Sequence, residues 1–176
     1  MKQFLAVQAI GKDRPGLAHE VVRIIADCGA SLAESRMLPL GAELAMQMLV
    51  CGNWHAVARL ESELTRLADS TGLALTLRRT EARGLREDHI PYSIDVIGPD
   101  QAGIVAGLTG FFASRQVEIG EVATRGYVAQ QTGAAMFAVQ MGINVPTRLH
   151  IAQLREDFMD YCDSQNLDAI LEPVKN

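Results

Sequence analysis

Residues 11–17 read Gly-Lys-Asp-Arg-Pro-Gly-Leu, and residues 98–104 repeat this pattern as Gly-Pro-Asp-Gln-Ala-Gly-Ile. The two stretches lie 87 positions apart, and each one follows an alternating apolar run and precedes a helix-periodic apolar run. A glycine-bearing loop between a strand and a helix can present backbone N–H groups to a small anion. The repeat therefore predicts a duplicated fold with one such loop in each half.

Hydrophobic periodicity extends the repeat to the whole chain. Alternating apolar residues predict strands, and apolar residues at spacings of three and four predict helices. In the first half the predicted order is strand 4–10, helix 17–28, strands 30–40 and 43–51, helix 57–67 and strand 73–78. In the second half it is strand 92–97, helix 104–112, strands 117–127 and 134–143, helix 151–161 and strand 168–172.

The order β-α-β-β-α-β, found twice, predicts an α+β protein made of two ferredoxin-like units. Each unit is expected to be an antiparallel sheet with its helices on one face. The expected domains are residues 1–80 and 91–176, joined by a charged linker at residues 81–90. A sheet with one uncovered face needs a covering surface, so we expect the sheets to pair with each other or in a homodimer.

The composition limits the partners of the chain. Apolar residues make up 48% of the sequence, which is enough for a packed core. The formal net charge of -5 argues against a general nucleic-acid binder, which usually carries a basic stripe. No apolar run approaches the ~18 residues that span a bilayer, and the first residues are too short an apolar run for a signal peptide. We therefore expect neither direct nucleic-acid binding nor a membrane partner.

The chemistry-bearing residues do not form a known catalytic or metal-binding motif. The three cysteines are widely spaced and odd in number, which favours a reducing compartment and hence the cytoplasm. The four histidines show no metal-ligand spacing with one another or with a cysteine. The sequence contains no P-loop, no Gly-x-Ser-x-Gly elbow and no His-Glu-x-x-His. We therefore expect no enzyme activity, no metal and no cofactor.

The combination of loop motif, element order and duplication resembles the ACT domain family. The first loop matches the family pattern Gly-x-Asp-x-Pro-Gly-Leu throughout. The second keeps Gly98, Asp100 and Gly103 but has Ala102 in place of proline. Two copies in a chain of this length, with nothing else attached, resemble the glycine cleavage system transcriptional repressor family.

This resemblance implies that a small effector such as an amino acid binds near the loop, often between two domains. Gly16 and Gly103 leave the backbone open, and the start of the following helix favours a carboxylate. Asp13 and Asp100 could receive an ammonium group, or could only cap loop and helix N–H groups. Ligand-binding members often carry Asn at the start of the next strand, where this chain has Ser31 and Glu118. The candidate ligand-binding residues are Asp13, Pro15, Gly16, Leu17, Ser31, Asp100, Gly103, Ile104 and Glu118.

The function implied by the resemblance is that of a non-enzymatic regulator. Such a protein would sense an amino acid, with glycine as the candidate, and would control a transcription factor by protein–protein contact. Two alternatives stay open from the residues. The chain could be an interaction module that binds no ligand, or a regulatory subunit of a metabolic enzyme.

Overall fold

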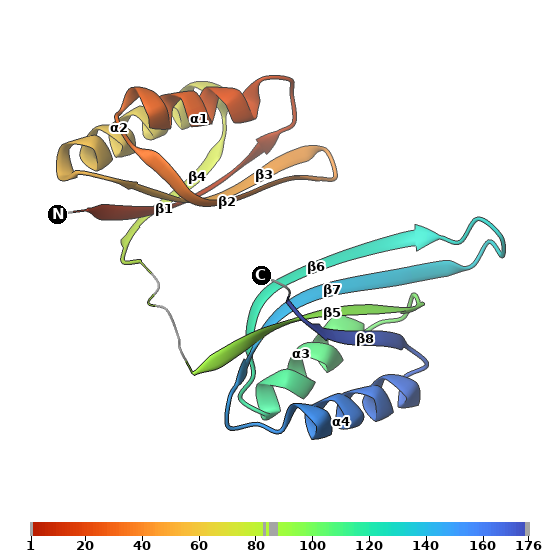
Figure 1. Ribbon diagram of the computed structural model, residues 1–176. Coiled ribbons are helices and arrows are strands. Elements are labelled where there is room, and N and C mark those ends of the chain that lie inside the picture. The colour runs from red at the N-terminus through yellow and green to blue at the C-terminus, as the bar shows by residue number, and fades with distance from the viewer. Residues whose placement is uncertain (1, 83, 85–87, 175–176) are drawn as a thin grey trace. The chain divides into compact units, whose positions relative to one another are not determined.

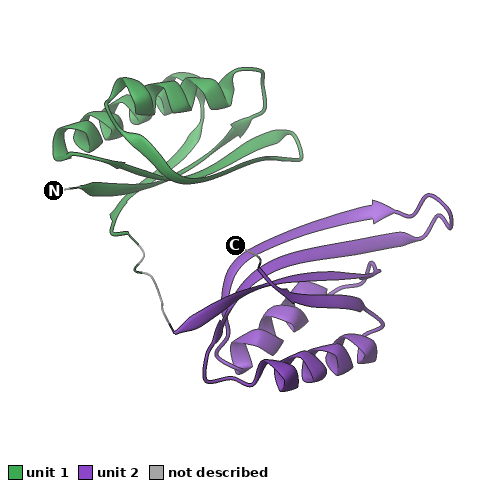
Figure 2. Ribbon diagram, viewed as in Figure 1, with its two compact units in different colours: residues 1–84 green, residues 85–176 purple. Residues whose placement is uncertain are grey.

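A computed structural model describes residues 2–82, 84 and 88–174. The chain divides into two compact units, residues 1–84 and residues 85–176 (Figure 2). Four residues of the predicted linker, at positions 83 and 85–87, lie outside the described residues. In the described part of the chain, no helix combines the length and the apolar character that crossing a membrane requires.

The first unit has the predicted element order (Figure 1). Its four strands form one antiparallel sheet in the order β2-β3-β1-β4, and both helices cover the same face of it. The elements are β1 (Gln3–Lys12), α1 (Leu17–Asp27), β2 (Ser31–Leu40), β3 (Glu43–Gly52), α2 (Trp54–Thr71) and β4 (Ala74–Thr80).

The second unit repeats this architecture with the strand order β6-β7-β5-β8. The elements are β5 (His89–Pro99), α3 (Ile104–Ser114), β6 (Glu118–Val128), β7 (Ala135–Pro146), α4 (Ile151–Ser164) and β8 (Asp168–Pro173). The predicted fold of two tandem βαββαβ units is therefore confirmed. Strand β5 begins at His89, inside the range predicted as linker, because His89 and Ile90 pair with the end of β7.

Each core lies between the helices and the inner face of the sheet. The predicted helix stripes are buried: Leu17, Val21 and Ile25 on α1 pack with alternate residues of the strands. In the second unit, Phe112 and Phe158 are fully buried, and their ring centroids lie 5.1 Å apart. Each unit therefore buries a hydrophobic core of its own.

The helices of the first unit begin and end at residue types that favour helix ends. The side chain of Asn53 accepts a hydrogen bond of 2.8 Å from the Ala56 N–H and so caps the start of α2. Gly72 ends α2 in the left-handed conformation, with φ of 72°, and Gly29 follows α1 with φ of 76°.

Both outer strands carry an irregularity near their start. The pairing of β2 with β3 shifts between Leu32 and Glu34, and the pairing of β6 with β7 shifts between Ile119 and Glu121. One extra residue in a strand changes which side chains point to which face. The shift decides which residues of β2 and β6 lie on the helix-free face of each sheet.

Candidate effector-binding loops

The first loop connects β1 to α1 and is exposed from Lys12 to Gly16. Gly16 stands at the start of α1 with φ of 90°, a left-handed conformation that favours glycine. The Asp13 N–H donates to the Ala42 carbonyl at 3.0 Å, which ties the loop to the β2–β3 hairpin. The loop therefore has a fixed backbone and an open outer surface.

The second loop has the same backbone design. Gly103 begins α3 with φ of 92°, and the Gly107 N–H donates to the Gly103 carbonyl at 2.8 Å. The Asp100 N–H donates to the Ala135 carbonyl at 3.0 Å, as Asp13 does to Ala42 in the first unit. The duplication thus extends to the link between loop and hairpin.

The first glycine of each motif has a packing role that the sequence reading missed. A Cβ on Gly11 would lie 2.8 Å from Leu73 Cδ1. A Cβ on Gly98 would lie 2.4 Å from Leu167 Cδ2 and 3.2 Å from the Asn166 carbonyl oxygen. An added Cβ would force the leucine side chain to move at both positions, and at Gly98 it would also press against the Asn166 backbone. The signal was present in the sequence, because both motifs begin with glycine.

The starts of α1 and α3 keep unpaired N–H groups. The backbone N–H groups of Ala18 and His19 donate to no described residue, and the same holds for Val105 and Ala106. No side chain caps either helix, so the interpretation of Asp13 and Asp100 as capping residues is wrong. Both carboxylates are exposed and accept no hydrogen bond from another described residue. Both loops can therefore offer N–H donors and a carboxylate to a ligand.

An ion pair distinguishes the first loop from the second. Arg14 Nη1 and Nη2 donate to Glu20 Oε1 and Oε2 at 2.7 and 2.6 Å. The hydrogen bond from Arg14 holds the pKa of the Glu20 carboxyl below its usual value. The second loop has Gln101 at the position of Arg14, and its side chain donates to the Gln165 carbonyl at 3.1 Å. Sequence reasoning did not single out Arg14, although it lies inside the motif.

The structure does not bring Ser31 to the first loop. Ser31 pairs with Cys51, which lies opposite Phe4 at the start of β1, whereas the loop follows the end of β1. Phe4 and Gly11 are seven residues apart on one strand, or roughly 23 Å. Within one unit, a small effector cannot contact both Ser31 and the loop.

Glu118 lies equally far from the second loop. It pairs with Asn144, which lies opposite Pro91 near the start of β5, whereas Gly98 lies at the other end of β5 and Asp100 follows that end. Leu17 and Ile104 are the first residues of α1 and α3, and their side chains are buried in the core, away from the exposed loops. The predicted residues that do gather at an exposed loop are Asp13, Pro15 and Gly16 in the first unit, and Asp100 and Gly103 in the second.

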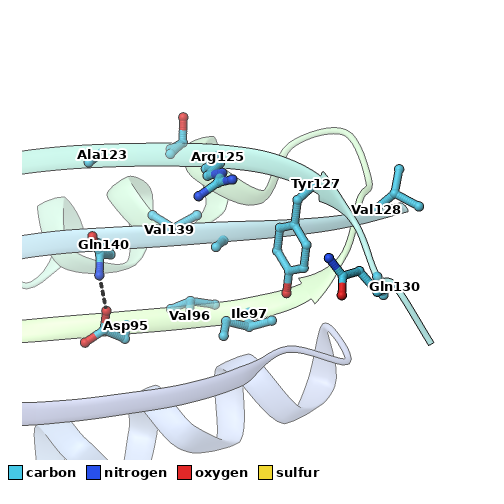
Figure 3. Close-up of a pocket in the computed structure, with 13 residues that line it drawn as sticks. Asp95, Val96, Ile97, Ala123, Arg125, Tyr127, Val128, Gln130, Val139 and Gln140 are labelled. Atoms are coloured by element: carbon cyan, nitrogen blue, oxygen red, sulfur yellow. Dashed lines mark hydrogen bonds between the residues drawn. The ribbon is translucent and has the colours of Figure 1, made fainter. Parts of the chain in front are cut away.

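A separate groove of about 660 Å³ lies on the helix-free face of the second sheet (Figure 3). Its lining includes Asp95 and Ile97 of β5, Arg125 of β6, and Ala138 and Gln140 of β7. Gln140 Nε2 donates to Asp95 Oδ1 at 2.9 Å across the floor. None of these residues was among the predicted site residues. Only the strand register shows that they share one face of the sheet, and the sequence alone does not fix that register.

Comparison with known proteins identifies the domain. Residues 3–78 match the family model of the ACT domain. A crystal structure from Galdieria sulphuraria, described as an unknown protein, is 26% identical and has a TM-score of 0.78, covering 99% of this chain and 100% of that one. The first unit therefore matches the ACT domain, and the second unit repeats its βαββαβ architecture.

The chain is related to the glycine cleavage system transcriptional repressors. The proteins of that name from Escherichia coli and Shigella flexneri are each 26% identical over 173 residues, which is 98% of this chain and 91% of the relative. A crystal structure of a protein provisionally given the same name has a TM-score of 0.74 at 26% identity, covering 100% of this chain and 99% of that one. The named relatives that span the whole chain are therefore regulators.

Proposed function

We propose that this chain is a non-enzymatic regulatory protein that binds a small amino acid at its first loop and controls a transcription factor by protein–protein contact. The observation that carries the proposal is the exposed first loop. It carries the side chains of Asp13 and Arg14, and the free N–H groups of Ala18 and His19 follow it at the start of α1. The family match covers this unit, and the full-length named relatives are transcriptional repressors.

The chemistry of the loop suits a zwitterion. A carboxylate would accept hydrogen bonds from the free N–H groups at the start of α1 and from the Arg14 guanidinium. An ammonium group would pair with the Asp13 carboxylate. Glycine is the candidate effector because it needs no side-chain pocket and because the relatives are named for glycine cleavage. Ser31 could complete such a site only from a different chain, and we expect the protein to act as a homodimer in the cytoplasm.

Isothermal titration calorimetry with the common amino acids tests the sensor function. We expect one of them, with glycine first among the candidates, to bind the wild-type protein. Asp13→Asn should weaken that binding by about tenfold or more, because an amide cannot pair with an ammonium charge. Asp100→Asn is the matched control and should leave the affinity of the first site unchanged. An absence of heat with every amino acid would contradict the proposal.

A second candidate function is an interaction module without a ligand. The observation that favours it is the presence of Ser31 and Glu118 at positions where ligand-binding members often carry Asn. A protein of this kind would retain its partner in a pull-down whether or not amino acids were added. A sensor should instead release or recruit the partner as the effector concentration changes.

A further inference from the structure

The helix-free face of the first sheet carries five rows of side chains that run across its strands. Along β1, Leu5, Val7 and Ala9 are buried against the helices, so the residues that alternate with them point to the other face. Figure 1 shows both helices on one side of this sheet. The strand register then defines each row, whose members come from β2, β3, β1 and β4 in that order.

A second copy of the sheet can lie on this face with the order of its strands reversed. A two-fold axis parallel to the strands, placed midway between β3 and β1, sets β2 opposite the partner's β4 and β3 opposite the partner's β1. This rotation leaves every position along the strands unchanged, so each row faces its own reverse. The arrangement is isologous, so each contact between two different residues occurs twice. Packed sheets lie about 10 Å apart with nearly aligned strands, which keeps the rows opposite each other near the axis.

Both rows that contain an acidic residue place a basic residue opposite it. The first of these rows is Glu34, Leu49, Ala6 and Arg78. Glu34 therefore faces the partner's Arg78. The second row is Leu40, Glu43 and Lys12, so Glu43 faces the partner's Lys12. None of these four charged side chains forms an ion pair or hydrogen bond with another described residue, so all four are available to a partner.

The apolar positions of the face match large side chains with small ones. Leu49 faces the partner's Ala6 in the row that begins at Glu34. The next apolar row is Leu38, Ala45, Ile10 and Ala74. Ile10, which is 37% exposed, faces the partner's Ala45, and Leu38, which is 44% exposed, faces the partner's Ala74. The exposed apolar surface of each isoleucine and leucine therefore has a space above an alanine to enter.

The two remaining rows set no like charges opposite each other. They are Arg36, Gln47, Gln8 and Thr76, followed by Ser31, Cys51, Phe4 and Thr80. Gln47 faces the partner's Gln8, and Arg36 faces the partner's Thr76. A two-fold axis across the strands, centred on the same rows, would instead set Arg36 opposite the partner's Arg36. The side chains therefore favour the axis parallel to the strands.

The second sheet lacks this property, although it has the same architecture. Its row that corresponds to Glu34 and Arg78 is Glu121, Gly142, Ser93 and Glu172, and the same rotation would set acid opposite acid. Self-complementarity is therefore specific to the first sheet. Its five rows cover roughly 20 Å by 30 Å, or about 600 Å² per copy, which is near the lower limit for a stable interface.

We infer that the helix-free face of the first sheet binds the same face of a second copy of this chain. The interface specifies the homodimer expected in the proposed function, but it does not depend on effector binding. Contacts of Glu34 with the partner's Arg78 fix the order of the strands, and the alanine contacts supply the apolar centre that such interfaces require. The first loop follows Lys12 and lies beyond the paired rows, so it stays open to an effector. Ser31 lies in the row farthest from the loops and remains far from both of them.

Sedimentation velocity over a wide range of protein concentration tests the charge pairs. The wild-type protein should form a dimer that dissociates on dilution. Glu34→Arg or Arg78→Glu alone should raise the dimer Kd by about tenfold or more, because each places like charges opposite each other twice. The double variant E34R/R78E restores opposite charges and should regain most of the affinity. Arg59→Glu, at an exposed position on α2, is the matched control.

A second variant tests the apolar centre without changing charge. Ala45→Trp fills the space that receives the partner's Ile10 and should abolish the dimer, whereas Ala26→Trp at an exposed position on α1 should leave it intact. Circular dichroism and the melting temperature establish that each variant is folded.

Four results would each overturn the inference. They are a monomeric wild-type protein, single charge reversals with the wild-type Kd, a double variant no tighter than the single ones, and an intact dimer in Ala45→Trp. Calorimetry with amino acids on the same variants reports effector binding separately, so the proposed function can fail without the interface and the interface without it.

Discussion

Arg14 and Glu20 form a doubly hydrogen-bonded ion pair that joins the first loop to the first turn of α1, with N–O distances of 2.7 and 2.6 Å. The pair occupies the guanidinium in the absence of an effector, and the second unit has no counterpart because Gln101 and Gly107 stand at the matching positions. Binding of a carboxylate by Arg14 would therefore compete with Glu20. This competition gives the two residues opposite effects on effector affinity.

Arg14→Ala should weaken amino-acid binding by about tenfold, because the variant loses a charge-assisted hydrogen bond and leaves Glu20 unpaired at the start of the helix. Glu20→Gln should not weaken binding and should strengthen it, since the guanidinium is released. Calorimetry measures both affinities. Both side chains are more than one-third exposed, so the melting temperature should change little in either variant. A tenfold loss in Glu20→Gln would contradict the competition.

Gly98→Ala should destabilise the protein by about 1–3 kcal/mol, the usual cost of overpacking, because the new Cβ meets Leu167 and the Asn166 backbone. Gly110→Ala is the control in the same unit. It lies in α3 with no atom within 4 Å of the added Cβ, and it should stabilise by up to about 1 kcal/mol. Urea unfolding followed by circular dichroism measures both changes. Equal stability of the two variants would show that the close approach at Gly98 is unimportant.

Glu61→Gln should lower stability at neutral pH and have no effect in acid. Arg79 donates to both carboxylate oxygens of Glu61, at 2.9 and 2.8 Å, and this hydrogen bonding lowers the pKa of the carboxyl. A group with a lowered pKa in the folded state stabilises the protein above its ordinary pKa, and this contribution disappears as the pH falls through the folded-state value. Urea unfolding of wild type and variant at neutral pH and near pH 3 compares the two conditions. A difference that persisted in acid would point to lost packing instead.

The cysteine thiols should resist labelling in the folded protein. Cys28, Cys51 and Cys162 are all buried, and burial raises the pKa of Cys162 to about 11. Because the thiolate is the reactive form, a thiol reagent at pH 8 should react slowly until denaturant is added, and then with three thiols per chain. Rapid reaction of all three in buffer alone would show that the units open readily.

The elements and loops could be predicted because their signals are local. The apolar face of a helix, the alternation along a strand and a glycine turn each depend on a few neighbouring residues. Because the fold is duplicated, each of these sequence patterns occurs twice in the chain. The sequence reading placed Gly16 and Gly103 at exposed turns, and there they adopt φ of 90° and 92°. The predicted element order holds in both units for the same reason.

The spatial grouping of the site residues could not be predicted in this way. Ser31 was grouped with the loop because ligand-binding ACT domains often carry Asn at the start of this strand, but α1 carries the chain back across the sheet before β2 begins. The residues that line the groove on the helix-free face come together through the strand register, including the shift between Ile119 and Glu121, which has no clear sequence signal. The Arg14–Glu20 pair depends on side-chain conformation, six residues apart across a turn.

The hydrogen bond from the Asp13 N–H to the Ala42 carbonyl has a mechanical consequence. A loop that moves when a ligand arrives must either break this bond or pull the tip of the β2–β3 hairpin along with it. Because β2 belongs to this hairpin and is the outermost strand of its sheet, movement of the hairpin would also move the edge of the sheet. Motion that starts at the loop would be delivered to the sheet edge, which is the part of a β-sheet most able to recruit or release another chain.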